Sequence, residues 1–199
     1  MDYRALGRSD LTVSVIGLGG ATVGREIDEA TSFAVLDRAL ERGITLFDTA
    51  AAYSQGRSEQ ILGRWIAERG VRDQIVLATK VASPLTPERI AASAEESLRR
   101  LGVTTIDLFQ LHSWDAAAPL EDALAALERL VQTGMVRTIG CSNFAAWQLC
   151  KSLWRQDVAG QPRFESVQPV YNLAKREIEA ELLPLCADQE VGVVTYSPL

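Results

Sequence analysis

The sequence predicts an α/β fold, a parallel (β/α)8 barrel preceded by a β-hairpin. Short apolar segments alternate with longer amphipathic segments along the 199 residues, as in parallel strands joined by helical crossovers. The apolar segments are nearly continuous in hydrophobic residues, which is typical of strands buried on both faces. An open doubly wound sheet would show the same alternation. The first strand–helix turn, GLGGAT at 17–22, lacks GxGxxG spacing, so we favour the barrel.

The pattern predicts seven strands and six intervening helices in a single domain, an incomplete barrel. The hairpin is expected at 3–15, with its turn at 7–10. Strands are expected at 15–18, 45–48, 75–80, 106–111, 136–141, 166–170 and 191–196. Helices are expected at 28–42, 58–69, 86–101, 120–132, 145–155 and 177–189. Capping residues suggest the helix ends: Ser58 as an N-cap, Thr86 before Pro87, and the glycines Gly43, Gly70 and Gly134 after helices.

Composition narrows the class of protein. Hydrophobic residues make up 47% and charged residues 23%, and the formal net charge is −6, which argues against nucleic acid or an anionic membrane as the main partner. No apolar run reaches about 18 residues, and the first residues show no signal-peptide pattern. The three cysteines, Cys141, Cys150 and Cys186, lack metal-ligand spacing. We therefore expect reduced thiols, no metal and a cytoplasmic location.

Four residues at the ends of successive strands could carry chemistry. Asp48 ends the second strand, Tyr53 lies in its loop, Lys80 ends the third strand, and the only histidine, His112, follows the fourth. In a (β/α)8 barrel these positions meet at one rim, where the active site lies. The lysine and aspartate should pair, because unpaired charge is costly there. A lysine near the tyrosine favours the phenolate and makes the tyrosine a possible general acid.

Taken singly, each residue has an ordinary structural explanation. Asp48 could cap a helix, Tyr53 could pack in its loop, Lys80 could be a solvated strand end, and His112 a core residue. Together they suit reduction of a carbonyl group, with a proton from the tyrosine and a hydride from a nicotinamide cofactor. A lyase or isomerase using Lys80 as a Schiff base is an alternative that requires Lys80 to be free of Asp48.

Several long motifs resemble the aldo-keto reductase family, whose members are NAD(P)H-dependent enzymes on a TIM barrel. GITLFDTAAAY, at 43–53, and the following SEQILG resemble the family's aspartate and tyrosine signature. LATK at 77–80 resembles its lysine strand, IDLFQLH at 106–112 its histidine strand, and GMVRTIGCSNF at 134–144 a further signature. VQPVYNLAKR at 167–176 and VVTYSPL at 193–199 complete the series. The blocks follow the family's order over nearly the whole chain.

The resemblance implies a role for each matching residue. Tyr53 would be the general acid, tuned by Lys80 and Asp48, and His112 would orient a small-molecule carbonyl substrate. The cofactor, NADP(H) or alternatively NAD(H), would be held by residues along the same rim: Gly20, Ala21, Asp48, Ser142, Asn143, Gln168, Tyr196, Ser197 and Leu199. Ser142 and Asn143 have the alternative of capping the next helix. Trp114 could wall the substrate pocket or pack within its loop. The oligomeric state is not predicted.

The chain also departs from the family pattern. Ser54 follows the tyrosine where glycine is common, and Met135 replaces a usual lysine. A full barrel takes about 250 residues or more, so we expect a C-terminally truncated barrel whose first and last strands have unpaired edges. The chain could be a fragment of a longer enzyme or a truncated relative that no longer catalyses. An NADPH-binding regulatory subunit is a further alternative.

Overall fold

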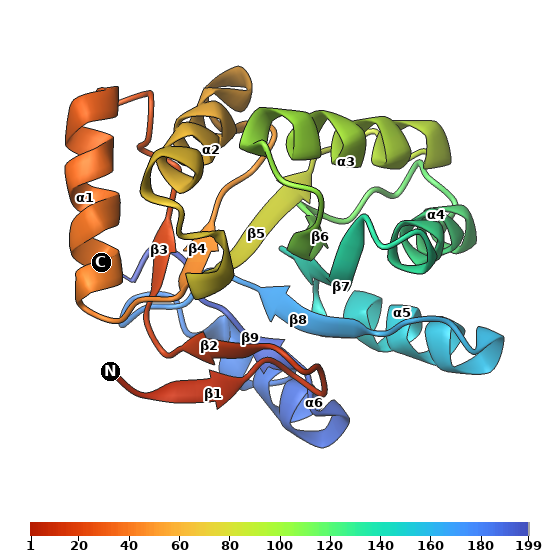
Figure 1. Cartoon of the computed structure of the whole chain (residues 1–199). Helices are drawn as coiled ribbons and strands as arrows, with labels where there is room; N and C mark the ends of the chain where they lie inside the picture. The colour runs from red at the N-terminus through yellow and green to blue at the C-terminus, as the bar shows by residue number, and fades with distance from the viewer. Residues whose placement is uncertain (199) are drawn as a thin grey trace.

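Seven short strands form one parallel sheet that curls into an incomplete barrel (Figure 1). The computed structural model describes residues 1–198. The strands neighbour one another in chain order: β3 (Gly17–Gly19), β4 (Leu46–Asp48), β5 (Val76–Val81), β6 (Ile106–Leu111), β7 (Val136–Ser142), β8 (Phe164–Gln168) and β9 (Gly192–Val193). Within the described residues, β3 and β9 are the two edges of this sheet. The predicted barrel topology and its open edges are confirmed.

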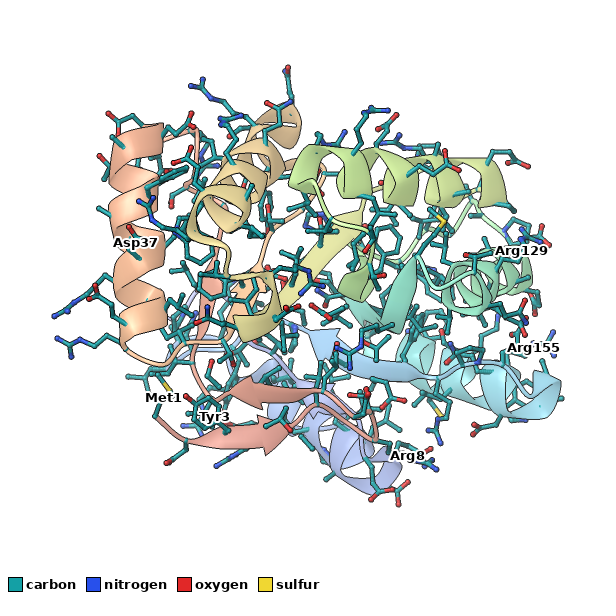
Figure 2. The ribbon with its side chains drawn as sticks, in the orientation of Figure 1. Met1, Tyr3, Arg8, Asp37, Arg129 and Arg155 are labelled. Carbon is teal, nitrogen blue, oxygen red and sulfur yellow. The ribbon has the colours of Figure 1, made fainter. Side chains whose placement is uncertain are left out.

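Six helices cover the outer face of the curled sheet (Figure 1). They are α1 (Glu29–Glu41), α2 (Arg57–Arg69), α3 (Pro87–Leu101), α4 (Leu120–Gln132), α5 (Ala146–Ala159) and α6 (Leu182–Gln189). The main core lies between sheet and helices, where Trp65 of α2 stacks on Phe47 of β4 at 5.2 Å between ring centroids. Charged residues such as Arg129 and Arg155 project outward from α4 and α5 (Figure 2). Each helix therefore covers the sheet with one apolar face.

The N-terminal hairpin packs against the inner face of the sheet. Its strands are β1 (Tyr3–Ala5) and β2 (Thr12–Ser14), and they pair antiparallel. A second apolar cluster joins the hairpin side chains of Leu6, Leu11 and Val13 to residues of the three strands β4, β5 and β6. The hydroxyl of Tyr3, labelled in Figure 2, donates to the carbonyl of Gly43. The hairpin therefore packs against the amino-terminal end of the barrel strands. The carboxyl ends of the strands lie at the opposite end.

One predicted N-cap and one predicted helix start are wrong. Ser58 does not cap α2, because the left-handed Gly56 holds the N-cap position; the Ser58 hydroxyl instead donates to the carbonyl of Gly20. The last helix begins at Leu182 and not at 177, where only a short 3-10 turn, η3 (Glu177–Glu179), forms. Pro184 explains the late start, since proline is tolerated in the first turn of a helix and not in its interior.

Some strand and helix limits also differ. β3 begins at Gly17, after the exposed Val15 and Ile16. β8 lies at 164–168 and not 166–170, and α5 continues to Ala159 before Gly160 ends it in a left-handed conformation. β9 has two residues, with Tyr196 forming only an isolated bridge to Val170. Within the described residues, β9 pairs with β8 alone.

A buried carboxylate joins α2, α3 and β5 behind the barrel wall. Glu59 is fully buried, and its two oxygens accept from Arg100 Nε at 2.6 Å and Thr79 Oγ1 at 2.6 Å. A Cβ added at Gly56 would lie 2.7 Å from Arg100 Cδ, so the arginine also supports the turn before α2. Thr79 directly precedes Lys80. The Glu59–Arg100 pair therefore stabilises both the turn before α2 and the strand that carries Lys80.

Glu59→Leu is expected to destabilise the fold by about 3 kcal/mol, because Arg100 would lose its buried partner. Glu29→Leu is the matched control, since Glu29 forms an exposed pair with Arg64 and such pairs contribute little. Urea unfolding of both variants measures the difference. Equal effects of the two substitutions would show that the Glu59 pair has no special structural weight.

Candidate active site

A buried ion pair lies at the ends of β4 and β5. Lys80 is fully buried, and its Nζ lies 2.5 Å from Asp48 Oδ2 and 2.8 Å from the carbonyl oxygen of Thr49. The two strands are hydrogen-bonded neighbours, which brings the two side chains to the same rim. A buried ammonium group needs such partners, because isolated charge in the interior is costly. The expected pairing of Lys80 with Asp48 is confirmed.

Tyr53 lies in η1 (Tyr53–Gly56), the short 3-10 turn between β4 and α2. Its hydroxyl is 3.5 Å from Lys80 Nζ. The three residues after it, Ser54, Gln55 and Gly56, have φ values of 49°, 56° and 85°, a left-handed run that glycine alone adopts freely. The departure at Ser54 therefore falls on a strained position, and its buried hydroxyl has no partner. This turn fixes the direction of the tyrosine.

His112 completes the group of four side chains. It follows β6, and its ring meets that of Tyr53 edge-on, with centroids 5.8 Å apart and an interplanar angle of 77°. Burial lowers the pKa of His112, the positive charge of Lys80 lowers it further, and Asp48 opposes the shift. The imidazole is therefore neutral at pH 7 and carries one N–H that can donate to a substrate oxygen.

The second oxygen of Asp48 accepts from two side-chain amides. Gln110 Nε2 lies 3.2 Å and Gln168 Nε2 3.1 Å from Asp48 Oδ1. The family resemblance marks Gln168 as a cofactor-binding candidate and does not single out Gln110. A signal was available in the sequence, because Gln110 interrupts the apolar strand 106–111 and a buried amide must be hydrogen-bonded.

Ser142, Asn143 and Tyr196 form a hydrogen-bonded chain beside the four residues. Ser142 Oγ donates to the carbonyl of Gln168 at 2.8 Å, and Asn143 Nδ2 donates to the carbonyl of His112 at 3.0 Å. The hydroxyl of Tyr196 donates to Asn143 Oδ1 at 2.7 Å. Ala145 holds the N-cap of α5, so the alternative of a capping role for Ser142 and Asn143 does not hold.

A cavity of about 950 Å³ adjoins this rim and continues along the gap between β3 and β9 to the hairpin. Its rim residues are Gly19, Ala21, Asp48, Tyr53, His112, Ser142, Asn143, Gln168, Tyr196, Ser197 and Pro198. Gly20 supports it from behind, since its N–H donates to the carbonyl of Asp48 at 2.7 Å. Leu199 lies outside the described residues. Hydroxyl and carboxamide groups on one wall fit the donor and acceptor needs of a nicotinamide carboxamide.

Trp114 belongs to an aromatic cluster next to the rim. It packs edge-on against Phe144 at 5.3 Å and against Trp147 at 5.6 Å between ring centroids. Its role therefore includes loop packing. Among residues 1–198, no group of three or more His, Cys, Asp or Glu side chains could hold a metal ion, and no helix is long and apolar enough to span a membrane.

The lowered pKa of His112 predicts a pH dependence of stability. The unfolded chain binds a proton near pH 6.5, whereas the folded chain resists it, so the free energy of unfolding should fall as the pH drops through that value. His112→Gln removes the only histidine and should flatten this part of the profile. Chemical denaturation between pH 8 and pH 5 compares the two proteins; parallel profiles would contradict the prediction.

Comparisons with known proteins agree with this geometry. The sequence model described as "Aldo/keto reductase family" matches residues 15–199. The chain is 39% identical to "Uncharacterized oxidoreductase YrpG" of Bacillus subtilis over 100% of its own length and 67% of that protein. It is 36% identical to "Aldo-keto reductase YhdN" of Bacillus subtilis, covering 100% of the chain and 62% of the relative. "Norsolorinic acid reductase B" of Aspergillus parasiticus is 33% identical, over 99% and 58% respectively.

The chain thus spans about three fifths to two thirds of the length of these curated relatives. The family match covers the rim residues and all seven strands of the sheet. The curled parallel sheet and the motif order agree with it. This chain belongs to the aldo/keto reductase family.

Proposed function

We propose that the protein reduces an aldehyde or ketone to an alcohol, with Tyr53 as the general acid. The single observation that carries the proposal is the convergence of Asp48, Tyr53, Lys80 and His112 at one rim, with Tyr53 Oη 3.5 Å from Lys80 Nζ. Membership of the aldo/keto reductase family supports an oxidoreductase acting on a carbonyl substrate. The relatives' names do not specify the substrate of this chain.

The four side chains would divide the work of moving one proton. Neutral His112 donates a hydrogen bond that orients the carbonyl oxygen next to the Tyr53 hydroxyl. Tyr53 gives its proton to that oxygen as hydride reaches the carbon, so the C=O bond becomes CH–OH. Lys80 stabilises the resulting phenolate by its charge, and Asp48 keeps Lys80 charged and in place. Solvent returns the proton to Tyr53.

A reduced nicotinamide, NADP(H) or alternatively NAD(H), supplies the hydride when bound. Ser142, Asn143 and Gln168 would hold its carboxamide, and the ring of Tyr196, with its hydroxyl tied to Asn143, would form one side of the nicotinamide site. Ala21 and Ser197 line the same cavity and would contact the rest of the cofactor. We place the reaction in the cytoplasm, where the three free cysteines would stay reduced.

The Schiff-base alternative is disfavoured by the same geometry. A lysine nucleophile must be neutral and free to attack, whereas Lys80 is fully buried and paired with Asp48 at 2.5 Å. Borohydride trapping in the presence of a carbonyl substrate tests this point directly. A covalent adduct on Lys80 would replace the reductase proposal.

Tyr53→Phe is expected to lower NADPH-dependent reduction of a test aldehyde by about 10²-fold or more, because a positioned acid is lost. NADPH affinity, measured by fluorescence titration, should change little. Tyr3→Phe, which removes a hydroxyl on the hairpin, is the control and should be fully active. Unchanged turnover in Tyr53→Phe rejects the proposal, and NADPH binding without turnover in the unsubstituted chain favours the non-catalytic alternatives.

A further inference from the structure

Gln110 is a buried polar side chain in the interior of β6, whose other buried polar residue, Asp107, is paired with two arginines. It is fully buried and pairs in register with Lys80 on the neighbouring strand. The preceding inward-facing residue of the strand, Leu108, packs in the apolar cluster with the hairpin. The sheet therefore offers Gln110 an environment in which a leucine or methionine would be the ordinary choice.

The orientation of the Gln110 amide carries a cost. Its Nε2 donates to Asp48 Oδ1 at 3.2 Å, while its Oε1 is buried without a hydrogen-bond partner. A buried acceptor left unpaired costs about 1–3 kcal/mol. Rotating the amide by half a turn would place Oε1 against the carboxylate, which is repulsive. In the observed orientation Gln110 Nε2 donates to Asp48, and Oε1 is left without a hydrogen bond.

The side-chain amide of Gln168 binds the same oxygen of Asp48, so the roles of the two glutamines can be compared. Gln168 Nε2 also donates to Asp48 Oδ1, at 3.1 Å. Under the proposed function, Gln168 has another partner, the nicotinamide carboxamide. Gln110 lies on β6, two residues before His112, and is further from the rim than Gln168 by two residues of the strand register. Its bond to Asp48 does not compete with that partner.

We propose that Gln110 is a positioning residue that holds the Asp48 carboxylate against Lys80 while Gln168 serves the cofactor. The inference rests on the proposed function and deepens it, because it names a residue that maintains the charge next to the general acid. The groups that face this carboxylate and Tyr53 are Lys80 from β5 and His112 from the end of β6. Gln110 acts on Tyr53 only through Asp48 and Lys80.

The direction of the effect follows from hydrogen bonding. A carboxylate that loses a neutral donor becomes more basic. Asp48 would then attract the ammonium proton that Lys80 donates to it more strongly, and Lys80 would present less positive charge to Tyr53. The phenolate of Tyr53 would be less stabilised, so a higher pH would be needed to form it.

The experiment compares Gln110→Met with Gln156→Met in the full chain. Gln156 is the matched control because it is also a buried glutamine with one unpartnered amide atom, located on α5. Three readouts are measured: kcat for a test aldehyde, NADPH affinity by fluorescence, and tyrosinate absorbance against pH as the difference from a Tyr53→Phe background. The absorbance titration reports on Tyr53 whether or not the chain turns over.

In Gln110→Met we expect kcat to fall about tenfold, with NADPH affinity within about threefold of the unsubstituted chain. The tyrosinate midpoint should rise by about one pH unit, the scale expected for one hydrogen bond to a buried charge. Gln156→Met should lose stability but keep kcat, NADPH affinity and the tyrosinate midpoint of the unsubstituted chain. An unchanged midpoint in Gln110→Met, or the same change in Gln156→Met, overturns the inference.

Gln168→Met provides a second measurement if Gln110→Met fails to fold. The midpoint in this comparison is measured with saturating NADP⁺, where Gln168 serves the cofactor and Gln110 alone holds Asp48, so NADPH affinity should weaken while the tyrosinate midpoint stays in place. A midpoint that moves in Gln168→Met as far as predicted for Gln110 assigns the positioning role to Gln168 and overturns the inference. Loss of the reductase proposal itself would be visible separately, as full turnover in Tyr53→Phe.

Discussion

The arrangement of the rim depends on one interaction, the buried ion pair between Lys80 and Asp48. A lysine with no exposed surface is stable only if its charge is matched at close range, and here a carboxylate and a backbone carbonyl surround the ammonium group. The pair joins the second and third strands of the barrel and lies next to the phenol of Tyr53. Gln110 and Gln168 donate hydrogen bonds to the carboxylate of Asp48. The charge of Lys80 contributes to the lowered pKa of His112.

Much of this could be predicted from the sequence, because the predictions relied on strand ends. Parallel strands place their carboxyl ends at one edge, so Asp48, Lys80 and His112 were expected to meet without knowledge of any distance. Tyr53 was harder, since a loop residue can point in many directions; the spacing of the family motif located it. The structure bears out the barrel topology, the open edges and the ion pair. The catalytic and cofactor-binding roles of the individual residues remain proposals.

The errors have physical causes in particular residues. Ser58 resembles an N-cap by residue type, but its hydroxyl serves the carbonyl of Gly20 from within the helix. The helix expected from 177 was placed by amphipathic pattern alone, and the pattern overlooked Pro184. Gln110 was missed because it stands in an apolar run that reads as a complete buried strand. Secondary-structure propensity predicts the backbone conformation of a strand. The reason for a buried amide such as Gln110 becomes visible only with its partner, Asp48, which lies on another strand.

The left-handed run at 54–56 limits which mutations the neighbourhood of Tyr53 can accept. Only glycine adopts such backbone freely, with asparagine and aspartate next, and β-branched side chains are the most strained there, so few substitutions suit the three consecutive positions beside the phenol. The loops after the fourth and fifth barrel strands, which carry Trp114 and lead into Trp147 at the start of α5, have no comparable run of strained backbone in the part of the chain described. Evolution of substrate preference in this lineage would therefore proceed through those loops, while the proton donor keeps its place.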